Sequence, residues 1–89
     1  MGFDATGAYL LVVSHAGRGV FCTKTWQKIA RDYSLVYPDG GVVPGFGPLA
    51  GQVINVQEKD YALGTVELTN DDLGVRLEYT EGTITVSDA

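Results

Sequence analysis

Short hydrophobic runs dominate the first third of the chain and predict β-strands. Residues 9–13 are apolar on both faces and rich in β-branched and aromatic side chains, which is typical of a central strand. Small polar residues and glycines at 14–19 interrupt the pattern, and residues 20–22 resume it. Together these segments predict a β-hairpin.

The second half carries the clearest strand signals. Four runs are apolar or alternate between apolar and polar residues with a period of two: residues 52–57, 65–69, 75–79 and 83–87. Residues 70–74, which are rich in Asn, Asp and Gly, and the pair Glu81 and Gly82 are turn signals between the last three runs. Three or four antiparallel strands are therefore expected in chain order.

One segment shows helical periodicity. Its hydrophobic residues recur at a spacing of three to four: Trp26, Ile29, Ala30 and Tyr33. Thr25 precedes them and can cap a helix by accepting a hydrogen bond from a free backbone amide. We therefore predict one short helix over about residues 25–33, with Trp26 as its buried anchor.

These elements predict a mainly β (α+β) fold of about six to seven strands. Such a chain forms a small antiparallel barrel or a strongly curved sheet, with the helix over one end or one face. Residues 42–51 are rich in Gly and Pro yet apolar, and are expected to form an ordered loop packed on the core. The 89 residues suffice for one domain spanning 1–89. Because small domains bury little surface, a homodimer is also expected.

Charge is distributed unevenly along the chain, whose net charge is −5. Up to residue 45 there are four basic and three acidic residues, whereas the remainder has two basic and eight acidic residues. Nucleic-acid binding starts from a basic stripe, and only four cations gather between Arg18 and Arg31. This composition argues against a DNA or RNA partner.

The acidic half predicts a candidate interaction surface. Strand alternation puts Glu67 and Glu78 on the outward faces of neighbouring strands. With the adjoining turns they form a compact acidic patch that can steer a basic protein partner: Glu67, Asp71, Asp72, Glu78 and Glu81. The competing interpretation is a solvated face whose charges prevent aggregation between sheets.

Catalytic and metal chemistry have few candidate residues. Cys22 and His15 are the only residues of their kinds, and a Cys–His pair could form an activated thiolate. Free cysteine is usually buried, so we expect Cys22 in the core and His15 in a turn. One His and one Cys do not make a metal site without several carboxylates, and neither a metal nor a cofactor is expected. Pro48 also removes an amide from the one Gly-rich segment that could cradle a phosphate.

Three function hypotheses follow. The first is a non-enzymatic protein-interaction module, such as an inhibitor or neutraliser of a basic protein. The second is a small barrel that binds an apolar or aromatic ligand between Trp26, Tyr37 and Phe46. The third is a minimal thiol enzyme using Cys22 and His15. The longest apolar run is too short to cross a bilayer, and the first residues lack the pattern of a secretory signal, so neither a membrane nor export is expected and the cytoplasm is the default location.

Overall fold

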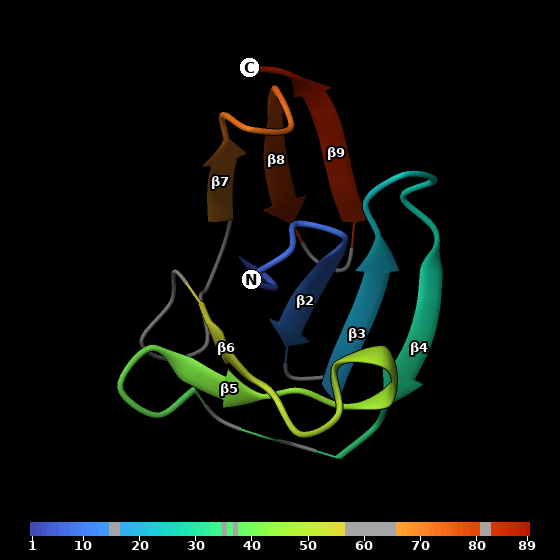
Figure 1. Ribbon diagram of the computed structural model, residues 1–89, viewed down its shortest axis with the longest axis vertical. Coiled ribbons are helices and arrows are strands. Elements are labelled where there is room, and N and C mark those ends of the chain that lie inside the picture. Colours follow the sequence, from blue (N-terminus) through green and yellow to red (C-terminus); the bar gives the residue numbers. More distant parts are fainter. Residues whose placement is uncertain (15–16, 35, 37, 57–65, 81–82) are drawn as a thin grey trace.

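The computed structural model describes residues 1–14, 17–34, 36, 38–56, 66–80 and 83–89 (Figure 1). Nine strands and one 3-10 turn lie within this part of the chain. They are β1 (Gly2–Phe3), β2 (Tyr9–Ser14), β3 (Gly17–Cys22), β4 (Lys28–Asp32), β5 (Val42–Pro44), η1 (Gly47–Leu49), β6 (Val53–Asn55), β7 (Val66–Asn70), β8 (Val75–Thr80) and β9 (Thr83–Asp88). The strands form three antiparallel sheets: the central sheet β1-β2-β3-β4, the small sheet β5-β6 and the C-terminal sheet β7-β8-β9.

The strand β2 lies inside the central sheet, as its continuous apolar run predicts. It pairs with β3 from Tyr9 opposite Cys22 to Ser14 opposite Gly17, which confirms the predicted hairpin. Successive side chains of a strand point to opposite faces. Because every residue from Leu10 to Val13 is buried, both faces of the central sheet must be covered.

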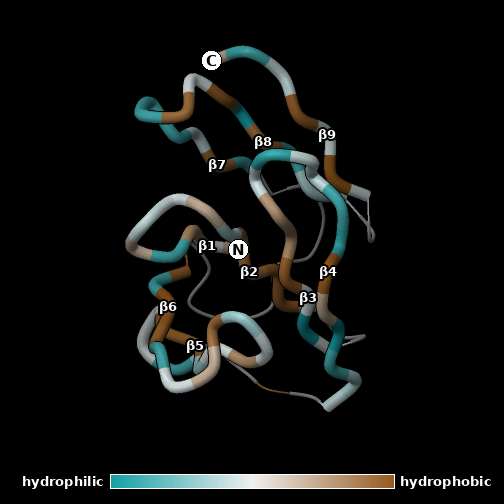
Figure 2. The backbone as a smooth tube through the Cα atoms, turned by 45° about the vertical axis from the view of Figure 1, so that its right-hand side comes forward, coloured by the Kyte–Doolittle hydropathy of each residue, from teal (hydrophilic) through white to brown (hydrophobic). Residues whose placement is uncertain are grey.

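Two hydrophobic clusters cover these faces. The first joins the central sheet to the small sheet and η1 through Leu11, Val13, Val20, Val43, Leu49, Ile54 and Val56. The second joins the central sheet to the C-terminal sheet through Met1, Leu10, Val12 and Leu77. The central sheet is therefore packed between two other sheets, and the apolar residues along β2 and β3 lie in the middle of the molecule (Figure 2).

The predicted helix over residues 25–33 is wrong, because Lys28–Asp32 forms strand β4. Residues 23–25 form a turn that is held by two backbone hydrogen bonds, from the Trp26 amide to the Cys22 carbonyl (2.7 Å) and from the Cys22 amide to the Gln27 carbonyl (3.0 Å). The turn folds the chain back so that β4 can pair with β3. Pairing of β4 with β3 in a hairpin overrides the helical pattern here.

The expected barrel or single curved sheet is replaced by three separate sheets, and no closed barrel forms among the described strands. Nine strands exceed the predicted six to seven because short strands occupy segments read as irregular. In particular, residues 42–51 contain β5 and η1, with Val43 and Leu49 buried. The expectation that this segment packs on the core is confirmed. In the described chain no helix is long and apolar enough to span a membrane.

Candidate functional site

The outward face of the C-terminal sheet is polar along all three strands. Its inward side chains include Leu68, Leu77 and Val86, which stand opposite one another across the sheet and belong to the second cluster. The residues between them therefore point outward. They form two rows across the sheet, Glu67–Glu78–Thr85 and Thr69–Arg76–Ser87.

Two glutamates stand directly opposite each other on this face, as Glu67 pairs in register with Glu78. Arg76 lies beside both, with one guanidinium nitrogen in an ion pair with Glu67 and 3.9 Å from a Glu78 oxygen. The three side chains remain about half exposed. Like charges opposite each other on neighbouring strands are destabilising, and one arginine can compensate only part of that cost.

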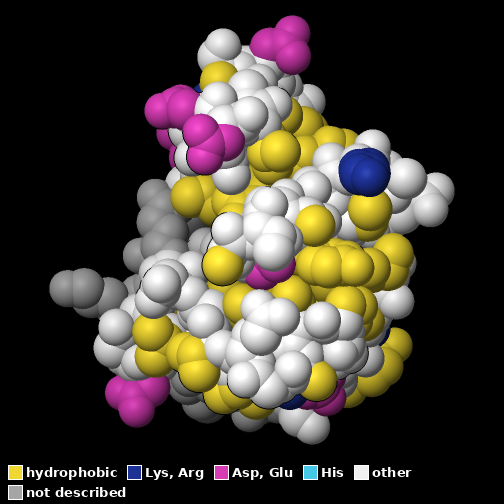
Figure 3. Space-filling view, viewed as in Figure 1, with side chains coloured by type: hydrophobic (Ala, Val, Ile, Leu, Met, Phe, Trp, Pro, Cys, Tyr) yellow, Lys and Arg dark blue, Asp and Glu magenta, His cyan; other side chains and the backbone are white. Residues whose placement is uncertain are grey.

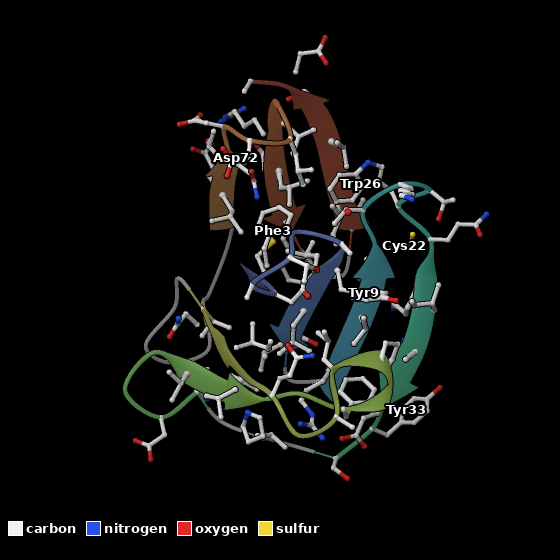
Figure 4. The ribbon with its side chains drawn as sticks, viewed as in Figure 1. Phe3, Tyr9, Cys22, Trp26, Tyr33 and Asp72 are labelled. Carbon is white, nitrogen blue, oxygen red and sulfur yellow. The ribbon has the colours of Figure 1, made fainter. Side chains whose placement is uncertain are left out.

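The β7–β8 turn adds two more carboxylates at the edge of the same sheet. The Leu73 amide donates to the Asn70 side chain (3.0 Å) and the Gly74 amide donates to the Asp71 carbonyl (3.2 Å), so the turn is well defined. Asp71 and Asp72 are both exposed on it, and Figures 3 and 4 show acidic side chains gathered at this end of the molecule. We call Glu67, Asp71, Asp72, Arg76 and Glu78 the acidic face. Glu81 lies outside the described residues.

The aromatic residues of the ligand hypothesis do not converge. Trp26 packs against the second cluster, on the β3–β4 connection beside β9 (Figure 4). Phe46 packs against the first cluster, near the other end of β3, where the Arg18 guanidinium lies 4.7 Å from its ring centroid. Tyr37 lies outside the described residues. Trp26 and Phe46 thus belong to different cores, and no single site contains both.

A polar clamp around Arg18 was not foreseen from the sequence. Its side chain is only 11% exposed and forms an ion pair with Asp32 on β4. It also donates a hydrogen bond to the Pro44 carbonyl (2.7 Å). The Arg18 bond and a second bond from the Ser34 amide lower the pKa of the Asp32 carboxyl. The clamp ties the central sheet to the end of β5 in the small sheet and serves the fold, because its charges satisfy one another.

Cys22 lies at the end of β3 and is half-exposed, so the prediction that it lies in the core is wrong. Hydrogen bonds from the Lys24 and Thr25 amides, and a further one from the Thr25 side chain, lower the pKa of its thiol. These donors come from the turn that replaces the predicted helix. His15 lies outside the described residues, so the structure gives no geometry for the Cys22–His15 pair.

The described side chains contain no group of three or more His, Cys, Asp or Glu residues placed to hold a metal ion. No protein-family model matches the chain, and no characterised protein or solved structure is significantly similar to it. The chemistry of the described surfaces is therefore the basis for a proposed function.

Proposed function

We propose that this protein is a non-enzymatic interaction module that binds a basic protein partner through the acidic face. The observation that carries the proposal is the register pairing of Glu67 with Glu78 across β7 and β8. Like charges directly opposite each other are destabilising, and Arg76 beside them offsets part of that cost, so stability alone does not account for the two glutamates. Their value is therefore expected to lie in binding.

The surroundings of the pair support the same proposal. Thr85 continues the row on β9, and the outward positions of β7, β8 and β9 that flank the pair are polar: Thr69, Arg76 and Ser87. Among the described residues from 66 to 89, five carboxylates accompany a single arginine. Such a concentration of one sign of charge accelerates encounters with a partner of the opposite sign and suppresses encounters with acidic proteins.

The aromatic ligand site of the second hypothesis is not proposed, because Trp26 and Phe46 lie in different clusters. A thiol enzyme would need a base placed near Cys22, and the described part of the chain supplies only amide and hydroxyl donors to the thiol. An inhibitor or neutraliser that acts by surface contact needs neither an aromatic pocket nor a catalytic pair.

The proposal can be tested by NMR titration with a lysine-rich peptide as a stand-in for the basic partner. We expect amide shifts on β7, β8 and β9 that saturate, with binding that weakens as salt rises because the screening length falls below about 8 Å. Glu78→Lys should weaken binding several-fold by reversing one charge in the centre of the face.

Asp39→Lys is the matched control, because Asp39 is exposed, lies beside the small sheet and changes the net charge equally. If Glu78→Lys and Asp39→Lys weaken binding equally, the peptide responds only to net charge. The acidic face would then be a solvated surface and the proposal would be wrong. Circular dichroism of both variants checks that each remains folded.

A further inference from the structure

The strand β4 forms a free edge of the central sheet. It pairs with β3 and, among the described strands, with no other (Figure 1). An edge strand presents unpaired backbone N–H and C=O groups on its outer side. Proteins that recognise extended peptides use such an edge to add the peptide as a further strand.

Two large hydrophobic residues are exposed along this edge. Ile29 is 48% exposed, and Tyr33, which directly follows the strand, is 75% exposed. Charges at Lys28 and Arg31 and a β-bulge opposite Val20 and Phe21 protect this edge from pairing with another flat sheet. Ile29 and Tyr33, four positions apart, remain exposed beside these charges and offer apolar contacts to the side chains of an added strand.

The charges at this edge that form no ion pair with a described residue are all basic. Lys24, Lys28 and Arg31 are exposed, and none of them forms an ion pair with a described residue. Arg31 stacks on Tyr33, with its guanidinium carbon 4.6 Å from the ring centroid. The nearest carboxylate in the chain, Asp32, is already paired with Arg18. The edge is therefore a basic and aromatic strip, far in sequence from the acidic face.

We propose that this strip is a second binding surface, which takes an extended acidic peptide segment of a partner protein as an added strand beside β4. Charge complementarity selects the occupant. A second copy of the chain would add its own Lys24, Lys28 and Arg31 to a surface that is already basic, whereas an acidic segment neutralises these charges. A nucleic acid would meet a molecule with a net charge of −5 and only three free cations on the strip, which is too few for substantial counterion release.

The test uses NMR titration with a probe peptide of alternating glutamate and valine, about six to eight residues long to match a strand. We expect saturable amide shifts along β4 and slowed hydrogen exchange of its outer amides. Arg31→Gln should weaken binding about threefold, and Lys28→Gln with Arg31→Gln about tenfold. Gln52→Glu changes the net charge as much as Arg31→Gln, at an exposed site just before β6, and should leave binding nearly unchanged.

A second probe, methylated on alternate backbone nitrogens, keeps every charge but cannot form the strand ladder. Equal binding of both probes would overturn strand addition, and so would the absence of β4 shifts at millimolar peptide. Tighter binding of a single-stranded oligonucleotide than of the acidic peptide would overturn the choice of partner. None of these outcomes bears on the proposed function of the acidic face, because that function is tested with a basic probe and with variants of different residues.

Discussion

Trp26 is the one non-glycine residue with a positive φ in the described chain, at 58°. A bulky residue rarely adopts this conformation because its Cβ approaches the following carbonyl. The turn retains this conformation because the indole packs against the second cluster. Helical periodicity in the sequence gave no sign of this, since the same tryptophan would suit the buried face of a helix.

The strain at Trp26 predicts an unusual order of stability. Trp26→Ala and Trp26→Gly both remove the indole, but only glycine adopts a positive φ without cost. We expect the glycine variant to be more stable than the alanine variant by about 1 kcal/mol, measured by urea unfolding. At most other positions a glycine variant is less stable than an alanine variant. If Trp26→Gly were less stable than Trp26→Ala, residue 26 would not have a positive φ.

Asp32 predicts how stability depends on pH. The Arg18 hydrogen bond lowers the pKa of Asp32 below its ordinary value of 3.8 in the folded state. A carboxyl with a lowered pKa stabilises the fold above its unfolded pKa, and this contribution is lost as the pH falls through the folded pKa. The difference in urea midpoint between the parent and Asp32→Asn should therefore be largest near pH 6 and shrink below pH 3.8. A difference that stays constant down to the acid limit would contradict the assignment.

At the scale of elements, strands with period-two alternation were predicted well. The runs at 65–69, 75–79 and 83–87 correspond to β7, β8 and β9, and the short turns between them set a register that places Glu67 opposite Glu78. Alternation and turn length are local signals, so both can be identified in the sequence. The candidate acidic face was predictable for the same reason.

The helix was predicted wrongly because the prediction assumed that hydrophobic residues at a spacing of three to four all face the core. Periodicity treats Ile29 and Tyr33 as inward residues, whereas both are exposed on the edge of the central sheet. The Arg18 clamp was missed for a related reason, because it joins β3 to the end of β5, 26 positions away. Contacts at that separation depend on how sheets pack, and no local pattern encodes them.

The turn containing η1 depends on close approach at Gly45. A Cβ at this position would lie 2.2 Å from the Leu49 carbonyl oxygen and 2.8 Å from the Leu49 side chain. Because Leu49 is fully buried, Gly45→Ala should destabilise the fold by about 1 to 3 kcal/mol. Gly51→Ala is a useful control, since its Cβ meets nothing within 4 Å and only its positive φ resists the change. Urea midpoints of the two variants measure the difference, and a smaller effect at Gly45 than at Gly51 would place η1 elsewhere.

At the scale of the whole molecule, the two proposed surfaces carry opposite charges and lie on different sheets. The basic strip lies on β4 of the central sheet and the acidic face lies on the outward side of the C-terminal sheet. Binding at one surface therefore need not obstruct the other. With both proposed surfaces occupied, the protein would join an acidic segment and a basic partner in one assembly.

The exposed area of the chain bears on the predicted homodimer. At 5184 Å² it is close to the roughly 5,000 Å² of a compact monomer of this mass, so a single copy does not need a partner to be compact. The second cluster nevertheless leaves a rim of partly exposed apolar side chains: Phe3, Phe21, Trp26, Leu68, Tyr79, Ile84 and Val86. Figure 3 shows hydrophobic side chains gathered between the C-terminal sheet and the central sheet. We expect this rim to support a weak dimer.

Light scattering over a dilution series measures this directly. A weak dimer should give a mass approaching twice 9.5 kDa at high concentration and fall towards 9.5 kDa on dilution, with a dissociation constant on the order of micromolar or weaker. Ile84→Ser removes apolar area from the rim and should shift the equilibrium to the monomer. Val53→Ser is the control, because Val53 is 66% exposed on the small sheet and lies outside the rim. A mass of 9.5 kDa at every concentration would show that the rim stays solvated and that the chain works as a monomer.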